Sequence, residues 1–226
     1  MTRKRFLQEL LSTILKLEIP HPLLIAIDSV DGSGKTTLAN ELAEELQSSG
    51  RQIIRISIDH FHNPKKIRYK KGPDSPEGFY FDSFDNGAII ENVLKPLGQE
   101  GSLRYKKSCF DYKNNVVIDA PTELAEKDAI VIFDGIFLQR PELIDYWDLK
   151  IFLEADFSTT VARAIARDGY YQNSKEATVK RYNERYVPGQ EIYFREARPK
   201  EVADIVIDNN TLENPTIIKN YEWLHD

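Results

Sequence analysis

The chain has 226 residues, of which 41% are hydrophobic, and its formal net charge is -6. This size and composition suit one substantial hydrophobic core, so we expect a single domain over residues 1–226. The acidic balance argues against a nucleic-acid partner, because binding along a phosphate backbone requires a broad basic surface, and no apolar run predicts a membrane span. The only cysteine, Cys109, cannot form an internal disulfide, which favours a cytoplasmic location.

The N-terminal segment, about residues 2–17, is predicted to form an amphipathic helix. Its apolar residues recur at helical spacing, namely Phe6, Leu7, Leu10, Leu11, Ile14 and Leu15. Polar residues such as Gln8 and Glu9 interrupt the apolar run, so we do not expect a secretory signal peptide. Packing against the domain is the first interpretation of this helix, and docking of a partner is the alternative.

Between Ile25 and Leu38, an apolar run is followed by a glycine-rich turn and then by a segment of helical character. We predict that this turn binds the phosphates of a nucleotide, through Asp31, Gly32, Ser33, Gly34, Lys35, Thr36 and Thr37. In this pattern Lys35 reaches the β- and γ-phosphates, and the Thr36 hydroxyl binds Mg²⁺. The strict pattern has glycine where this chain has Ser29, and a plain strand-turn-helix connection is the alternative.

Five short apolar runs are predicted to be strands, at residues 23–27, 53–58, 129–133, 149–153 and 203–207. Helical patterns separate several of them, at residues 36–48, 86–97 and 158–168. Strands that are nearly continuous in Ile, Val and Leu and are joined by helices indicate an α/β fold, with a parallel sheet covered on both faces. Ligands of such folds bind at the carboxyl ends of the strands.

Carboxylates follow three of these strands, namely Asp28, Asp59 and Asp134, and we expect them to converge on the phosphate-binding loop. Asp134 is the candidate Mg²⁺ ligand, directly or through water, and the alternative is a turn or helix cap. Asp59 is the candidate general base that accepts the proton of an attacking hydroxyl. Two alternatives for Asp59 stay open: a second, water-mediated Mg²⁺ ligand, and a metal site shared with His60 and His62.

Two pairs of arginines with a spacing of four residues are candidates for phosphate contacts. Arg163 and Arg167 project from one face of the predicted helix 158–168 and would clamp the phosphates when a lid closes. Arg181 and Arg185 repeat the spacing. For each pair the alternative is a solvated helix face.

The segment 65–71 holds five cations in seven residues. A mobile, solvated loop is its first interpretation, and attraction of an anionic acceptor such as a sugar phosphate is the alternative. Aromatic residues occur in the neighbouring segments, where they would sandwich a base or a sugar or belong to the core: Phe79, Tyr80, Phe81, Phe84, Phe110 and Tyr112.

An ordered series of motifs spans nearly the whole chain: Asp31-Gly-Ser-Gly-Lys-Thr-Thr37, Ile58-Asp-His-Phe61, Tyr80-Phe-Asp-Ser-Phe-Asp85, Phe133-Asp-Gly-Ile-Phe137, Arg163-Ala-Ile-Ala-Arg-Asp168, Arg185-Tyr-Val-Pro-Gly-Gln190 and Ala203-Asp-Ile-Val-Ile-Asp-Asn209. The series resembles the uridine kinase-like branch of P-loop small-molecule kinases, which includes phosphoribulokinase and relatives of bacterial pantothenate kinase. The resemblance implies a P-loop NTPase fold of three α/β/α layers, with a five-stranded parallel sheet of order 2-3-1-4-5 and a helical lid over about residues 163–190.

The resemblance also implies an activity, the Mg²⁺-dependent transfer of the γ-phosphate of ATP to the 5′-hydroxyl of a nucleoside. Asp59 falls on the catalytic aspartate of the family, Lys35 and Thr36 fall on its phosphate and Mg²⁺ residues, and Arg163 and Arg167 look like its lid arginines. Asp134 occupies the acidic Mg²⁺ position, where many relatives carry glutamate. The implied acceptor contacts are Phe61, Tyr80, Asp82, Tyr112, Arg181 and Gln190.

One departure from the family pattern concerns the acceptor. Uridine-cytidine kinases follow an aromatic-Asp-aromatic segment with a histidine that reads the pyrimidine edge, whereas the segment 110–115 of this chain has none. A nucleoside is the first candidate acceptor; a sugar phosphate, pantothenate or glycerate is the alternative, and a non-catalytic nucleotide-dependent regulator is the second alternative. The sequence leaves open the preference for ATP over GTP, feedback regulation and the formation of a homo-oligomer.

Overall fold

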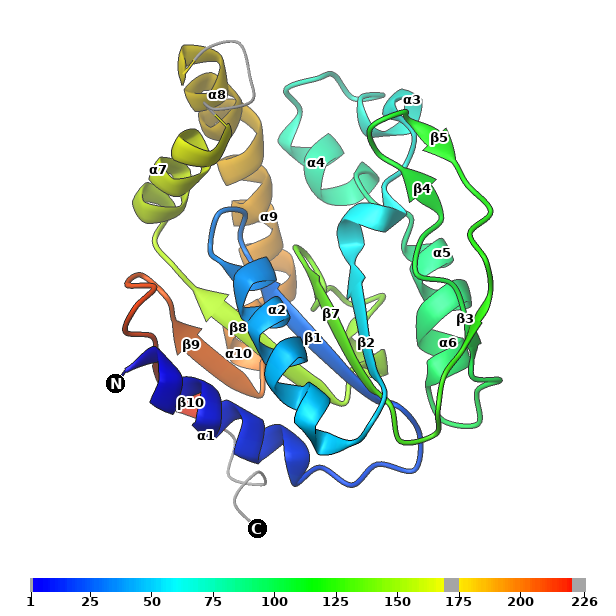
Figure 1. The fold of residues 1–226 in the computed structure, drawn as a ribbon. Helices are drawn as coiled ribbons and strands as arrows, with labels where there is room; N and C mark the ends of the chain where they lie inside the picture. Colours follow the sequence, from blue (N-terminus) through cyan, green and yellow to red (C-terminus); the bar gives the residue numbers. More distant parts are fainter. Residues whose placement is uncertain (1, 169–174, 221–226) are drawn as a thin grey trace.

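The computed structural model describes residues 2–168 and 175–220, and a six-stranded sheet forms its middle layer (Figure 1). The strands are β1 (Leu23–Ser29), β2 (Ile53–Ser57), β7 (Ile130–Gly135), β8 (Leu149–Glu154), β9 (Ile205–Asp208) and β10 (Thr216–Asn220). The first five are parallel to their neighbours, in the order β2-β7-β1-β8-β9, and β10 pairs antiparallel with β9 at the edge.

The edge strand β10 adds an antiparallel sixth strand to the five parallel strands that the sequence analysis predicts. Its sequence, Thr-Ile-Ile-Lys-Asn, contains only two apolar residues, and none of its residues is buried. A short, half-polar edge strand carries a weak hydrophobic pattern, which is why the sequence did not reveal it.

Strand β1 lies in the middle of the sheet and is buried at every position. Side chains alternate between the two faces of a strand. Leu23, Ile25 and Ile27 therefore join one hydrophobic cluster, while Leu24 and Ala26 join another on the opposite face. This arrangement requires helices on both faces and explains the near-continuous apolar run in the sequence.

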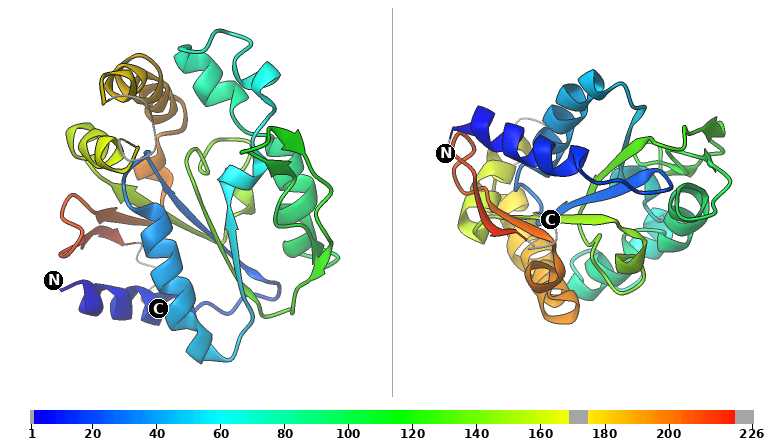
Figure 2. Two further views of the ribbon diagram at one scale, coloured as in Figure 1. Left: turned by 45° about the horizontal axis from the view of Figure 1, so that its top comes forward. Right: turned by 90° about the horizontal axis from the view of Figure 1, so that it is seen from below.

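Helices α1 (Arg3–Leu15) and α2 (Lys35–Leu46) cover one face of the sheet, as the view from below in Figure 2 shows. Phe6, Leu10 and Ile14 of α1 are fully buried and pack in the same cluster as the apolar side of α2. The apolar stripe of the N-terminal helix is thus occupied by the core of this protein. A short 3₁₀ turn, η1 (Gln47–Ser49), ends α2.

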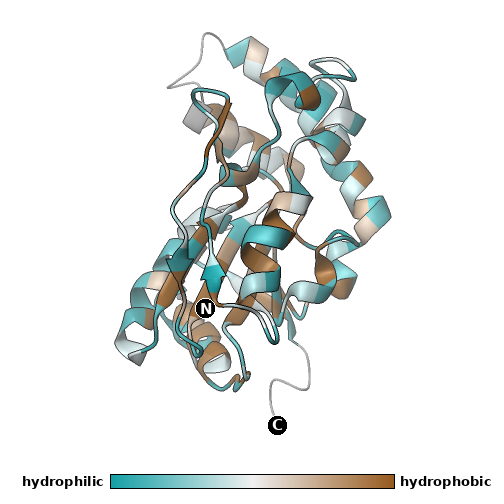
Figure 3. Cartoon of the chain, turned by 90° about the vertical axis from the view of Figure 1, so that its right-hand side faces the viewer, coloured by the Kyte–Doolittle hydropathy of each residue, from teal (hydrophilic) through white to brown (hydrophobic). Residues whose placement is uncertain are grey.

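The opposite face is covered by α4 (Pro76–Asp82), by α9 (Val187–Ala197), which α10 (Pro199–Val202) follows, and by a helical stretch over residues 86–97. The sequence predicts one helix over that stretch, whereas the structure has α5 (Asn86–Ile89), a π-helical turn η3 (Ile90–Leu94) and α6 (Lys95–Leu97). In Figure 3 the helices that face the viewer carry both hydrophobic and hydrophilic residues, as expected of the outer layers of a sandwich.

The remaining elements lie around the carboxyl ends of the parallel strands or along the β2 side (Figure 1). They include α7 (Phe157–Asp168), α8 (Lys175–Arg181), the π-helical turn η5 (Tyr182–Tyr186), the 3₁₀ turns η2 (Ile58–Phe61) and η4 (Ile144–Tyr146), α3 (Lys65–Arg68), and two small ribbons, β3 (Arg104–Tyr105) with β6 (Glu123–Leu124) and β4 (Phe110–Asp111) with β5 (Val116–Val117). Among the described helices, none has the length and apolar character needed to cross a membrane.

Candidate active site

The glycine-rich turn between β1 and α2 has the backbone of a phosphate-binding loop. Gly32 and Gly34 have φ angles of 78° and 96°, in the left-handed region that glycine alone adopts without strain. A Cβ atom on Gly32 would lie 2.5 Å from the Thr160 carbonyl oxygen, so no other residue fits there. Ser29, which replaces the glycine of the strict pattern, is buried, and its hydroxyl donates to the Leu153 carbonyl at 2.6 Å. The serine therefore ties β1 to β8.

Side chains behind the loop hold it in place. The Asp31 backbone N–H donates to Oε1 of Gln190 at 2.7 Å, and the Asp31 carboxylate accepts from the Tyr182 hydroxyl. Nδ2 of Asn209 donates to the Ser33 carbonyl at 2.7 Å. Gln190 also donates to the Tyr186 carbonyl at 2.8 Å and is buried. Its amide is occupied by backbone groups, so the structure makes Gln190 a positioning residue and corrects its expected role as an acceptor contact.

The sequence-predicted Mg²⁺ residues, Thr36 and Asp134, are brought together. Thr36 lies in the first turn of α2, Asp134 lies near the end of β7, and the Thr36 hydroxyl donates to Oδ2 of Asp134 at 2.6 Å. Hydroxyl and carboxylate oxygens form the ligand set that Mg²⁺ prefers, so these residues fit the ion. Lys35 lies at the start of α2 and lines the same cavity.

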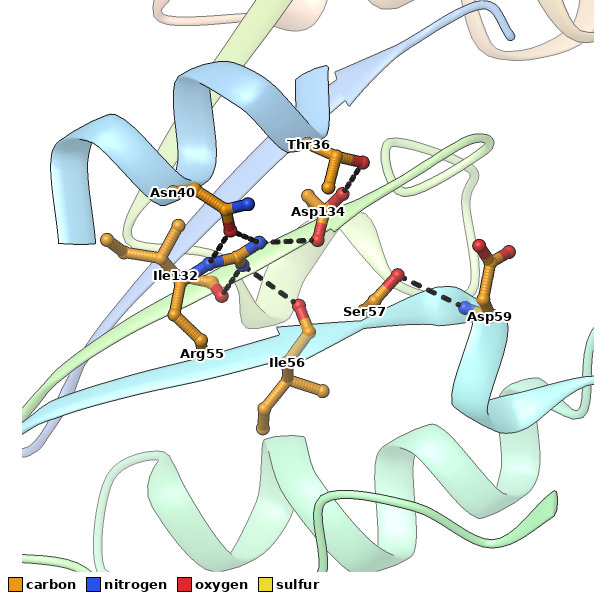
Figure 4. Close-up of polar contacts among 8 residues, drawn as sticks. All are labelled: Thr36, Asn40, Arg55, Ile56, Ser57, Asp59, Ile132 and Asp134. Atoms are coloured by element: carbon orange, nitrogen blue, oxygen red, sulfur yellow. Dashed lines mark hydrogen bonds and ion pairs between the residues drawn. The ribbon is translucent and has the colours of Figure 1, made fainter. Parts of the chain in front are cut away.

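Arg55 on β2 completes this group, although the sequence analysis did not identify it (Figure 4). Its Nη2 lies 3.0 Å from Oδ1 of Asp134, its Nη1 donates to the Ile132 carbonyl at 2.8 Å, and Nη2 donates to the Asn40 amide oxygen at 3.1 Å. Both carboxylate oxygens of Asp134 therefore have donors. In the strand register Arg55 lies opposite Ile132 and Ser57 lies opposite Asp134. Residues two apart on a strand share a face, so the polar residues Arg55 and Ser57 on β2 were the available sequence signal for a polar contact with β7.

Replacing Arg55 with methionine is expected to lower the free energy of unfolding by about 2 kcal/mol, because a buried carboxylate loses a charged hydrogen-bond partner. Arg55→Lys keeps the charge and should lose less. Urea denaturation measures both variants, with Arg5→Met as a control because Arg5 is exposed on α1. Equal stability of wild type and Arg55→Met would show that the Arg55–Asp134 pair does not stabilise the fold.

Asp59 lies in the 3₁₀ turn that follows β2, and its carboxylate points away from the strand (Figure 4). The Ser57 hydroxyl accepts from the Asp59 backbone N–H at 3.4 Å and caps this turn. The side chain of Asp59 is exposed and lines the cavity that also contains Lys35, Thr36 and Asp134. Within the described residues, no group of three metal-binding side chains forms a metal site, so the alternative of an Asp59–His60–His62 site has no support.

The site opens into a cavity of about 810 Å³, which extends from the phosphate-binding loop to α3, the β4–β5 ribbon and η5. Three rings form a column in it: the His62 ring lies 4.5 Å from that of Phe84 and 4.6 Å from that of Tyr112. Nδ1 of His62 lies 2.9 Å from the Asp59 carbonyl oxygen. Burial lowers the pKa of His62, which favours its neutral form.

The structure brings only some of the expected acceptor contacts to this cavity. Tyr112 and Arg181 line it. Phe61 and Tyr80 are buried in the hydrophobic core, and Asp82 forms an ion pair with Lys71 at 2.8 Å. The expectations for Phe61 and Tyr80 are corrected because the inner faces of η2 and α4 point into the core, which sequence spacing alone does not show. The expected acceptor contact of Asp82 stays a prediction.

The two arginine pairs differ in their positions relative to the cavity, which the sequence did not predict. The Arg163 guanidinium donates to the backbone carbonyls of Asn209 at 3.1 Å and Asn210 at 2.7 Å, and Arg163 does not line the cavity. The side chain of Arg167 lies outside the described residues. Arg181 and Arg185 do line the cavity. The contacts of Arg163 therefore differ from the expected phosphate clamp, because carbonyl groups occupy its guanidinium.

Asp28 precedes the loop but is fully buried and does not line the cavity, contrary to the expectation that it converges on the loop. It accepts from the Tyr193 hydroxyl and from the Gln139 backbone N–H at 3.2 Å. Burial raises the pKa of Asp28 from 3.8 to about 6, because removal from water disfavours the charged carboxylate.

This buried carboxylate predicts a pH dependence of stability. The folded-state pKa of Asp28 lies above its unfolded value, so the unfolded chain binds fewer protons in this range and stability falls as the pH rises from about 4 to about 6. Asp28→Asn removes this contribution, and its stability relative to wild type should rise by about 2 kcal/mol between pH 4.5 and pH 7. Urea denaturation at both pH values measures it, with exposed Asp74→Asn as the control. A pH-independent difference would contradict the prediction.

A phosphate-binding loop after the central strand, with a threonine and an aspartate brought together beside it, defines a P-loop nucleotide-binding protein of the α/β class. Residues 24–213 match the model of the "Phosphoribulokinase / Uridine kinase family". The chain belongs to this family, and it is a small-molecule kinase with ATP as co-substrate.

Individual proteins agree with this assignment. The uridine-cytidine kinase B of Dictyostelium discoideum is 26% identical over 189 residues, which cover 83% of this chain and 74% of the relative. A uridine kinase of Clostridium novyi (strain NT) is 31% identical over 150 residues, which cover 65% of this chain and 68% of the relative. The solved structure of a possible uridine kinase from Bacillus stearothermophilus has a TM-score of 0.72 at 20% identity, and covers 90% of this chain and 97% of its own. This last likeness supports the fold.

Proposed function

We propose that this protein transfers the γ-phosphoryl group of ATP, with Mg²⁺, to a hydroxyl group of a small molecule, and that Asp59 is the general base. The observation that carries the proposal is the arrangement of one cavity: Lys35, the Thr36–Asp134 pair and the exposed Asp59 all line it. Phosphoryl transfer needs these three functions together, namely phosphate binding, charge neutralisation and proton acceptance.

Each residue has a role that its surroundings support. The loop N–H groups and Lys35 bind the phosphates, and Thr36 and Asp134 hold the ion. Mg²⁺ in this position neutralises charge that develops between the β- and γ-phosphates. The Asp59 carboxylate makes no hydrogen bond or ion pair with the described residues, so it is available to orient the acceptor hydroxyl and take its proton. The lid over about residues 163–190 stays a prediction.

Two lines of evidence favour different classes of acceptor. The names of the similar proteins support a nucleoside, and the exposed ring of Tyr112 beside His62 offers a stacking surface for a base. A second candidate class, an acceptor with an anionic group, is favoured by the arginines that line the cavity. A nucleotide-dependent regulator without catalysis is disfavoured, because the proposed base is present and exposed.

The test of the proposal is acceptor-dependent ADP release from ATP and Mg²⁺. The panel contains uridine, cytidine, ribulose 5-phosphate, pantothenate and glycerate, and each reaction is repeated without Mg²⁺. Turnover that requires both an acceptor and Mg²⁺ supports the kinase assignment and identifies the acceptor class. Tight ATP binding with no acceptor-dependent turnover across the panel would favour the regulator instead.

A further inference from the structure

Three arginines line the same cavity: Arg68 at the end of α3, Arg181 at the end of α8, and Arg185 in η5. Among residues 2–168 and 175–220, none of the three forms an ion pair with a carboxylate. Arg68 and Arg185 are also buried, with 4% and 3% of their surface exposed. Buried arginines are normally paired, so this cluster needs an explanation.

Arg185 has a structural explanation. Its Nη1 donates to the backbone carbonyls of Pro73 at 2.9 Å and Ser75 at 3.1 Å, and its Nη2 donates to the Arg68 carbonyl at 3.3 Å. These contacts fasten the segment after α3 to η5, so carbonyl oxygens compensate for the burial of the Arg185 guanidinium.

Arg68 has no such compensation. Its Nε donates to the Asn63 carbonyl at 2.7 Å, but Nη2 is buried without a hydrogen-bond partner, and Nη1 makes no hydrogen bond with the described residues. The guanidinium lies 4.7 Å from the centre of the Tyr112 ring, which contributes a weak cation–π attraction. The Tyr69 ring makes a second contact of this kind, with its centre 5.4 Å from the guanidinium. One hydrogen bond and two rings leave this buried cation without a carboxylate partner among the described residues.

Four carboxylates line the same cavity, namely Asp31, Asp59, Asp111 and Asp134, but none of them forms an ion pair with these arginines among the described residues. Burial lowers the pKa of Arg185, the Tyr186 and Tyr69 hydroxyls raise it, and the positive charges of Arg181 and Arg68 lower it. The exposed Lys65 and Lys66 add positive charge on α3 itself. This part of the cavity is therefore complementary to an anion.

We infer that Arg68 and Arg181 form a subsite for an anionic group, a phosphate or a carboxylate, that the acceptor carries in addition to the hydroxyl that is phosphorylated. The inference rests on the proposed kinase function and selects between its two acceptor classes. A chain of contacts connects the subsite to the residue proposed as the base: His62 contacts the backbone carbonyl of Asp59, the Tyr112 ring contacts the His62 ring at a tilt of 49°, and Arg68 lies over the Tyr112 ring. An acceptor that lies along this chain of contacts has its anionic group at Arg68 and its hydroxyl at Asp59.

The test compares binding of ribose 5-phosphate, glycerate and neutral uridine to the protein saturated with ADP and Mg²⁺, by isothermal titration calorimetry. The nucleotide occupies the phosphate-binding loop, so a second anion reports on the arginine subsite. The variants are Arg68→Gln and Arg181→Gln, and Lys70→Gln is the matched control, because Lys70 is an exposed cation in the same segment that does not line the cavity. Arg181 is exposed, so its replacement keeps the test valid even where Arg68→Gln fails to fold.

The inference predicts that ribose 5-phosphate or glycerate binds to wild type and Lys70→Gln alike, and at least about tenfold more weakly to each folded arginine variant. The anion that binds with the higher affinity identifies the bound group as a phosphate or a carboxylate. The subsite would be overturned if neither anion bound, or if wild type and all variants bound the anions equally. Uridine turnover with an unchanged KM in Arg181→Gln would also overturn it. Each of these results would leave the kinase function intact. Arginine-dependent anion binding without acceptor-dependent ADP release would instead keep the subsite and contradict the kinase function.

Discussion

Replacing Asp59 with asparagine is expected to lower kcat by about 10²- to 10⁴-fold, the range typical of losing a general base. Asparagine keeps the size of the side chain but cannot accept a proton at neutral pH. The Asp59 side chain is exposed and its backbone N–H, not its carboxylate, bonds to Ser57, so the substitution should leave the turn and the fold intact. Steady-state kinetics with the acceptor found in the panel measure the loss.

The result is specific to catalysis when nucleotide binding is unaffected. Asp59→Asn should bind ADP and Mg²⁺ with wild-type affinity, since the proposed phosphate contacts come from Lys35, Thr36 and the loop backbone. A variant with wild-type kcat would show that Asp59 is not the base. A parallel loss of ADP·Mg²⁺ affinity would favour the alternative in which Asp59 is a second, water-mediated Mg²⁺ ligand.

Replacing Lys35 with methionine is expected to lower kcat by about 10²- to 10³-fold, because a fixed positive charge beside the transferring phosphoryl group is removed. It should also raise the KM for ATP. Lys35 lies at the start of α2, and the only hydrogen bond of its ammonium group to the described residues is a long one, 3.5 Å, to the Val30 carbonyl. The loss of Lys35 should therefore affect ligand contacts far more than stability.

Two measurements separate these effects for Lys35→Met. Kinetics give kcat and the KM for ATP, and urea denaturation gives the free energy of unfolding. Lys127→Met, a change at an exposed lysine outside the cavity, is the matched control. Wild-type turnover in Lys35→Met would mean that the glycine-rich turn is not where the γ-phosphate binds.

The parts of this protein that the sequence predicted well are those with local signals. The phosphate-binding loop requires glycines at fixed positions, and Gly32 and Gly34 indeed have left-handed backbones. Four of the five parallel strands are mostly buried and appear as nearly continuous apolar runs, whereas β2, buried on one face, alternates apolar and polar residues. The Thr36–Asp134 contact was predictable because adjacent parallel strands end at the same edge of the sheet.

The parts that the sequence did not predict depend on whether a side chain points into the core, toward backbone groups or into the cavity. Tyr80 and Phe61 have the residue types of a ligand site, yet they pack in the core, since aromatic residues serve both purposes. Gln190 and Arg163 are polar and lie near the loop, but backbone groups occupy them. Arg55 and Arg68 became candidates only when the structure showed the charged and unpaired groups around each of them.

The measurement that tests the central claim most directly is identification of the reaction products. Wild type and Asp59→Asn are incubated with ATP, Mg²⁺ and each acceptor of the panel, and ADP and the phosphorylated acceptor are quantified by mass spectrometry. The kinase assignment predicts equal amounts of ADP and one phosphorylated acceptor from wild type, and a large loss of both from the variant. ADP without any phosphorylated acceptor, or equal product from the two proteins, would contradict it.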